Sequence, residues 1–120
     1  RFDLIICFHV LEHILEDNKA IKELNRVLKD NGDLLIQVPL KKGKTYQDNS
    51  IISKKGRLKA FGQEDHVRIY GEDSLPLILN ENGFSAKPID IVKEYNSEEK
   101  KLYGFSENEV IYVCRKASSP

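Results

Sequence analysis

The sequence predicts an α/β fold built around a partly parallel sheet. An apolar run at residues 4–8 is followed by a helical pattern from Asp17 and by a second apolar run at residues 34–38. Such runs, rich in isoleucine and leucine, are typical of strands buried on both faces, as in parallel sheets. Two parallel strands need a crossover connection, and the helical segment between the runs is long enough to provide it.

The helix between the two runs is predicted from apolar residues that recur at a spacing of three or four, with charged residues between them. These apolar residues are Ala20, Ile21, Leu24, Val27 and Leu28. We expect Asp17 to be the N-cap, because its carboxylate can accept from the first free backbone N–H groups. Asp30-Asn31-Gly32 is expected to end the helix in a left-handed turn.

Residues 41–59 differ from the rest of the chain, because they contain many lysines and one acid, Asp48. We predict a long mobile loop with a single helical turn near residues 50–52. Loops of this length in compact domains are usually functional or disordered. Residues 41–66 are therefore expected to form a lid.

The C-terminal part repeats the alternation of helix and strand. A helix is expected from Glu72, with Pro76 in its first turn and Gly83 at its end. Pro88 predicts that the next strand, at residues 84–92, lies at a sheet edge. The last expected segments are a polar connection at 93–108, partly helical at 97–102, and a final strand at 110–114.

Composition limits the classes of function. The 120 residues suffice for one domain. The 19 basic residues balance the 19 acidic ones, so neither nucleic acid nor a membrane is an expected partner. Cys7 and Cys114 lie in strand-like runs, and two buried free thiols are typical of a cytoplasmic protein. The sequence lacks methionine and opens directly on a strand, so we interpret it as a fragment.

Three segments carry a resemblance to a known family. Phe2-Asp3 precedes an apolar run and then Leu11-Glu12-His13-Ile14, and Leu24-Asn25-Arg26-Val27-Leu28-Lys29 is followed by Gly32. The third segment is Asp65-His66-Val67-Arg68 with Tyr70 and, later, Asn82-Gly83-Phe84. In this order the sequence resembles class I S-adenosylmethionine-dependent methyltransferases, in particular the type 11 group that includes ubiquinone and menaquinone methyltransferases.

The resemblance implies a Rossmann-like fold whose sheet has the order 3-2-1-4-5-7-6. This chain would be its C-terminal half, a mixed sheet of strands 4-5-7-6 with the last strand antiparallel and with flanking helices. Residues 1–116 would form the partial domain and residues 117–120 a tail. The sequence contains no Gly-x-Gly, the family's cofactor loop, so we expect this chain alone to bind S-adenosylmethionine weakly or not at all.

The resemblance also implies the site. Cys7, Phe8, His9 and Val10 would line the methionine part of the cofactor, because ligands of open α/β sheets bind beyond the carboxyl ends of the strands. His9 and His66 are the candidate catalytic residues, and imidazoles are common general bases. Arg68 and Tyr70 would contact a small-molecule acceptor or hold the lid. Glu12 and His13 are expected to steady the loop, and no metal ligand is assigned.

Two other functions remain open. His9-Val10-Leu11-Glu12-His13 matches the inverted zinc-protease motif His-x-x-Glu-His, which requires a helix through all five residues. Alternatively, the chain is a non-catalytic remnant or an interaction module. The apolar edge at residues 4–8 would then pair with a second copy, as a homodimer or by strand exchange.

Overall fold

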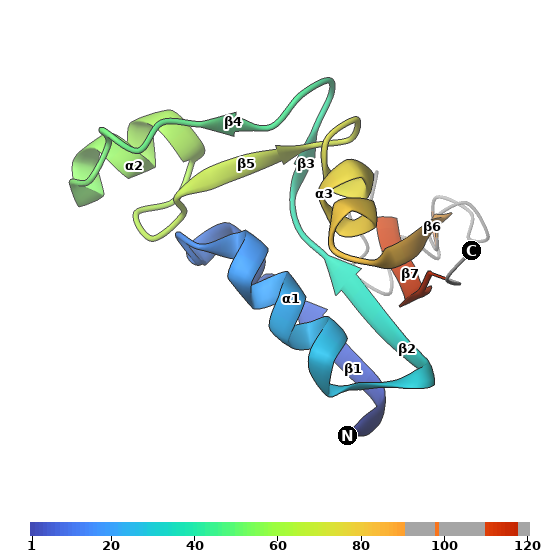
Figure 1. Ribbon diagram of the computed structural model, residues 1–120. Helices are drawn as coiled ribbons and strands as arrows, with labels where there is room; N and C mark the ends of the chain where they lie inside the picture. Colours follow the sequence, from blue (N-terminus) through green and yellow to red (C-terminus); the bar gives the residue numbers. More distant parts are fainter. Residues whose placement is uncertain (91–97, 99–109, 118–120) are drawn as a thin grey trace.

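The computed structural model describes residues 1–90, 98 and 110–117. Its main sheet has four strands in the order β1-β2-β7-β6 (Figure 1). β1 (Phe2–Phe8) pairs in parallel with β2 (Leu28–Gln37), and β7 (Val110–Lys116) is antiparallel to both β2 and β6 (Phe84–Asp90). The predicted order 4-5-7-6 with an antiparallel last strand is confirmed.

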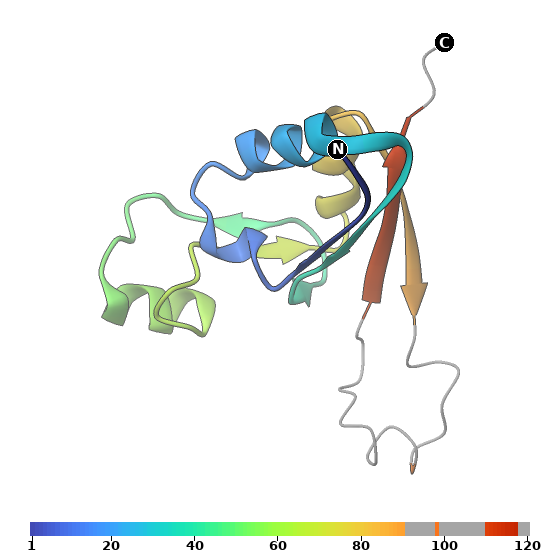
Figure 2. The same cartoon turned by 90° about the horizontal axis from the view of Figure 1, so that it is seen from below.

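Two helices cover one face of this sheet. α1 (Asp17–Val27) and α3 (Leu75–Glu81) lie on the same side of the strands (Figure 2). Their apolar side chains form the core with the inward residues of the strands, as the helical spacing predicts. The fully buried apolar members are Leu11, Ile21, Leu28, Leu34, Ile36, Leu75, Leu79, Phe84 and Cys114.

The other face of β1 is open. Phe2, Leu4 and Ile6 are 59%, 53% and 59% exposed, whereas Cys7 on the helix side is buried. The prediction that this strand is buried on both faces is therefore wrong for the part of the chain that the structure describes. The reason is that α1 and α3 both pack on the same side, leaving alternate side chains of β1 uncovered.

Residues 40–71 form a second, three-stranded sheet and a helix. β3 (Leu40–Lys41) and β4 (Tyr46–Gln47) flank β5 (Arg68–Gly71), in parallel and antiparallel pairing respectively. The eight-residue helix α2 (Lys54–Phe61) is capped by the Ser53 hydroxyl, which accepts from the Gly56 N–H, and ends at left-handed Gly62. The prediction that this segment has no regular structure is wrong, because β5 supplies strand partners from outside it. Near residues 50–52 the chain forms a turn in which the Ile51 N–H donates to the Asp48 carbonyl at 3.1 Å, and the helix itself begins later, at Lys54.

Some boundaries of the helices and strands were predicted correctly, and one was not. Pro76 does lie in the first turn of α3, Gly83 is left-handed at φ 86°, and β6 with Pro88 is an edge strand. The N-cap of α1 is Glu16 rather than Asp17, which is the first helical residue.

The predicted left-handed stop at residues 30–32 is also wrong. Leu28 already belongs to β2. Gly32 serves close packing instead, since a Cβ there would lie 2.9 Å from the Asp3 carbonyl oxygen.

Cys7 and Cys114 are buried and free, as predicted. No helix in the described ranges is both long enough and apolar enough to cross a membrane. The expected connection at residues 93–108, with its partly helical piece at 97–102, lies outside the described residues apart from Glu98.

Candidate functional site

The carboxyl end of β1 makes a sharp turn at His9. This residue has φ 55°, the left-handed region that L-residues other than glycine seldom adopt. Its N–H still donates to the Gln37 carbonyl of β2 at 2.8 Å, so strand pairing continues to the turn itself. A single 3₁₀ turn, η1 (Leu11–His13), follows. A strained residue at a strand end is a common feature of functional sites.

The four residues predicted to line the cofactor have different environments. Cys7 is only 6% exposed and packs in the core. Burial raises the pKa of its thiol, and the nearby Glu12 carboxylate adds to the effect. The thiol therefore stays neutral, which does not suit a nucleophile. Phe8 is half-buried, whereas Val10 is 41% exposed and the His9 side chain 57% exposed.

Arg68 is the most highly connected side chain near this turn, and it is fully buried. Its guanidinium donates to the backbone carbonyls of Leu11 at 2.6 Å and Leu15 at 2.8 Å, and also to that of Ile14. Its Nε donates to Gln47 Oε1 at 2.8 Å. One side chain on β5 thus ties the loop after β1 to the small sheet.

Tyr70 reinforces this tie from the same strand. Its hydroxyl donates to Asp17 Oδ2 at 2.7 Å, and the Arg68 guanidinium carbon lies 5.6 Å from its ring centroid. Burial and then the bond to Asp17 raise the pKa of the Tyr70 phenol. Of the two roles predicted for Arg68 and Tyr70, these contacts favour holding the segment over contacting an acceptor.

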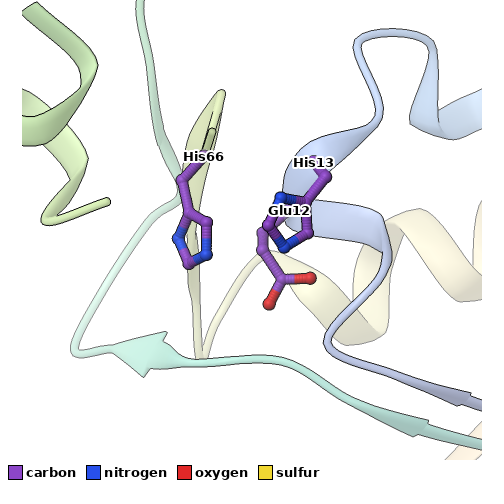
Figure 3. Close-up of side chains that lie close together, drawn as sticks. All are labelled: Glu12, His13 and His66. Atoms are coloured by element: carbon purple, nitrogen blue, oxygen red, sulfur yellow. The ribbon is translucent and has the colours of Figure 1, made fainter. Parts of the chain in front are cut away.

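Three side chains converge between η1 and the loop that enters β5 (Figure 3). The ligand atoms of Glu12, His13 and His66 all lie within 4.8 Å of one another. The two imidazole rings meet edge to face, with centroids 4.6 Å apart. His66 was predicted to be functional, whereas Glu12 and His13 were assigned only a steadying role. The adjacent Glu12 and His13 after a strand were the signal in the sequence. No spacing rule predicts that His66, 53 residues after His13, lies beside them.

The predicted catalytic pair His9 and His66 is not brought together in this group. His9 Nδ1 lies 3.7 Å from Glu12 Oε2, and it is Glu12, not His9, that belongs to the group with His66.

The helix required by the inverted zinc-protease motif is absent from the described segment at residues 9–13. β1 runs to Phe8, His9 is left-handed, and only a 3₁₀ turn follows.

A pocket of about 300 Å³ adjoins this group. It lies beyond the carboxyl end of β2, between α2 and the start of β5. Its walls combine apolar and polar side chains, a mixture that suits a small molecule. The lining residues are Glu12, Pro39, Phe61, Gly62, Gln63, His66, Arg68 and Ile69.

Comparison with known proteins identifies the family. A profile described as a methyltransferase domain matches residues 1–87. The chain belongs to this methyltransferase family. The class I methyltransferase resemblance predicted from the sequence is thereby confirmed. No curated protein matches the sequence.

Solved structures agree on the fold of this methyltransferase chain. The 1,6-didemethyltoxoflavin-N1-methyltransferase of Burkholderia thailandensis, solved with S-adenosylhomocysteine, has a TM-score of 0.61 at 16% identity over 98% of this chain and 45% of that one. An S-adenosylmethionine-dependent methyltransferase from Mesorhizobium loti has a TM-score of 0.62 at 11% identity, over 96% and 62% respectively.

A third similar structure has a different printed activity. The [4+2]-cyclase SpnF has a TM-score of 0.62 at 17% identity, over 98% of this chain and 52% of that chain. At these identities the similarity shows the fold alone, and a fold can host several chemistries. The chain covers 45% of the Burkholderia methyltransferase and 52% of SpnF, which is about half the length of each.

Proposed function

We propose that this chain forms the acceptor side of an S-adenosylmethionine-dependent methyltransferase that acts on a small molecule. The observation that supports it best is the pocket of about 300 Å³ beyond the carboxyl end of β2, in a chain of the methyltransferase family. Ligands of open α/β sheets bind at this edge. The acceptor would lie against Phe61, Gln63 and Ile69, which supply both apolar contact and a hydrogen-bonding amide.

The end of β1 fits one side of the cofactor. Phe8 and Val10 offer a partly exposed apolar surface there, and His9 turns the backbone outward. The sequence has no Gly-x-Gly, so a closed cofactor site requires segments other than these. When bound, S-adenosylmethionine supplies an electrophilic methyl group. The task of the protein is then mainly to position the acceptor and exclude water.

His9 is the residue proposed to take a proton from the acceptor. Its side chain is 57% exposed, and its Nδ1 lies 3.7 Å from Glu12 Oε2. A neutral imidazole can accept a proton at one ring nitrogen, which suits a general base. His66, proposed as the second functional histidine, lines the pocket itself.

The test measures S-adenosylhomocysteine formation by the full-length protein with a panel of small-molecule acceptors. His9→Asn, which tolerates the left-handed backbone, is expected to lower kcat about 10²–10⁴-fold. Lys22→Gln, an exposed change on α1, is the matched control and should keep full activity. Cofactor binding without any turnover would contradict methyl transfer and favour a non-methylating reaction on the same fold. Calorimetric titration of this chain alone with S-adenosylhomocysteine should show weak binding or none.

A second candidate is self-association through β1. Its outer edge has no strand partner among the described residues, and Leu4 and Ile6 expose apolar surface beside it. We propose that a second copy covers this edge, because an antiparallel pair of identical edges is self-complementary. Sedimentation velocity should show a dimer that the double variant Leu4→Lys, Ile6→Lys dissociates. A monomer at all accessible concentrations would exclude this candidate.

A further inference from the structure

Glu12 carries a buried carboxylate that nothing nearby satisfies. The residue is 1% exposed, and both carboxylate oxygens lack a hydrogen-bond partner among the residues that the structure describes. The Nδ1 atom of His9 lies 3.7 Å from Glu12 Oε2, beyond hydrogen-bonding distance. A buried carboxylate without partners costs several kcal/mol, so such groups in proteins are normally paired or bind a metal.

Two imidazoles lie where a metal ion would need them. The ligand atoms of Glu12, His13 and His66 all lie within 4.8 Å of one another. In Figure 3 both rings and the carboxylate surround one space. Donors that share an ion at about 2.1 Å are roughly 3–3.5 Å apart, so the side chains need to close by only about 1–2 Å.

The hydrogen bond of His13 sets its tautomer. Its Nδ1 lies 3.1 Å from the Asp65 carbonyl oxygen and 3.3 Å from Asp65 Oδ2. A carbonyl oxygen can only accept, so Nδ1 carries a hydrogen, and in the neutral ring Nε2 is the nitrogen with a free lone pair. Histidines that bind metals typically have this outer hydrogen bond to a carbonyl or carboxylate. The same bond orients the ring.

The two segments that carry the ligands are held together without a metal. The Val67 N–H donates to the Glu12 carbonyl at 2.8 Å, directly beside His66. Arg68 fixes the loop on the other side through the Leu11 carbonyl. The ligand positions are therefore preorganised, which reduces the entropy cost of binding an ion.

We propose that Glu12, His13 and His66 bind one divalent transition-metal ion. Two imidazoles and one carboxylate form a donor set that favours Zn²⁺, Fe²⁺ or Co²⁺ over Mg²⁺ or Ca²⁺. Three protein ligands leave at least one coordination position open. Because Glu12 and His66 also line the pocket of about 300 Å³, that position is accessible to water or to a ligand oxygen.

The test is calorimetric titration of the chelator-treated full-length protein with Zn²⁺, and in parallel with Mg²⁺. One equivalent of Zn²⁺ should bind, and Mg²⁺ should bind far more weakly. His13→Gln and His66→Gln should each weaken Zn²⁺ binding by more than the 10–100-fold typical of losing an outer partner. Lys22→Gln, an exposed change on α1, should leave the affinity unchanged. Absence of stoichiometric Zn²⁺ binding, or binding retained when both His13 and His66 are replaced, would overturn the proposal.

Thermal unfolding of Glu12→Gln gives a readout that does not depend on methyl transfer. With chelator, the variant should melt at the same temperature as the wild type or higher, because a neutral amide is easier to bury than an unpaired carboxylate. With Zn²⁺ at about one hundred times Kd, the wild type should gain roughly 10 °C and the variant almost nothing. A variant that is less stable than the wild type in chelator would indicate a protein partner for Glu12 instead of a metal.

Discussion

Arg68→Met tests whether one buried guanidinium holds the loop after β1. Methionine keeps the apolar stem of the side chain but removes every hydrogen bond that the guanidinium makes. The acceptors left behind are three backbone carbonyls and the Gln47 amide oxygen. The Asp17 carboxylate, whose Oδ2 lies 3.6 Å from Nε, loses an ion pair but keeps the hydrogen bond from Tyr70. A buried acceptor without a donor is costly, whereas an acceptor near the surface can turn to water.

The expected loss can be worked out from the burial of these acceptors. The bond to the Leu11 carbonyl is fully buried, and those to the Ile14 and Leu15 carbonyls and to Gln47 are partly buried. Leu15 and Gln47 are exposed residues, so their oxygens can be hydrated in the variant. The two remaining charged hydrogen bonds, at about 1.5–3 kcal/mol each, give a loss of roughly 4 kcal/mol in the free energy of unfolding.

Urea unfolding followed by circular dichroism measures this loss. With a slope of about 2 kcal/mol/M, the midpoint should fall by roughly 2 M. Arg68→Lys keeps the charge but cannot reach all the acceptors, so its loss should be about half as large. Arg26→Met removes an exposed pair with Glu23 and should cost less than about 0.5 kcal/mol. The reasoning is refuted if Arg68→Met is no less stable than Arg26→Met.

Three further predictions concern the core, a tight contact and the strained turn. Cys7 and Cys114 should resist iodoacetamide until urea unfolds the protein. Since burial raises the pKa of Cys114 from 9.0 to about 12, stability should fall as the pH rises between these values, and Cys114→Ala should flatten that fall. Gly71→Ala should destabilise more than Gly62→Ala in urea melts, because its Cβ would meet backbone that cannot move aside, whereas Gly62 has open space and costs only about 1 kcal/mol for its positive φ. His9→Gly should leave the urea midpoint nearly unchanged, because relief of about 1–2 kcal/mol of strain offsets a more flexible unfolded chain, yet should abolish methyl transfer; a large loss of stability would show that His9 is structural.

The main sheet could be predicted from the sequence because its signals are local. The runs at residues 4–8 and 34–38 are strongly apolar, and the helix between them has a regular period. The boundaries of α1 could not be predicted as well. Leu28 fits the helical period but belongs to β2 and pairs with Phe2 of β1, because the pairing of the sheet outweighs helix propensity there.

The small sheet and the three-residue group could not be predicted, since both depend on distant pairing. β3 and β4 are two residues each, and their strand partner is β5. No apolar period marks strands so short. In the same way, Glu12 and His13 become significant only when His66 is brought beside them by that sheet.

These observations give the small sheet a structural role in the site. Three consecutive residues leading into β5 contact the loop after β1 in different ways. His66 places its ring against His13, Val67 donates its N–H to the Glu12 carbonyl, and Arg68 donates to the carbonyls that flank them. Together these contacts join the small sheet to the loop after β1. We therefore infer that β3, β4 and β5 fix the carboxyl edge of the parallel strands in place, so loosening Arg68 should impair the site before it unfolds the sheet.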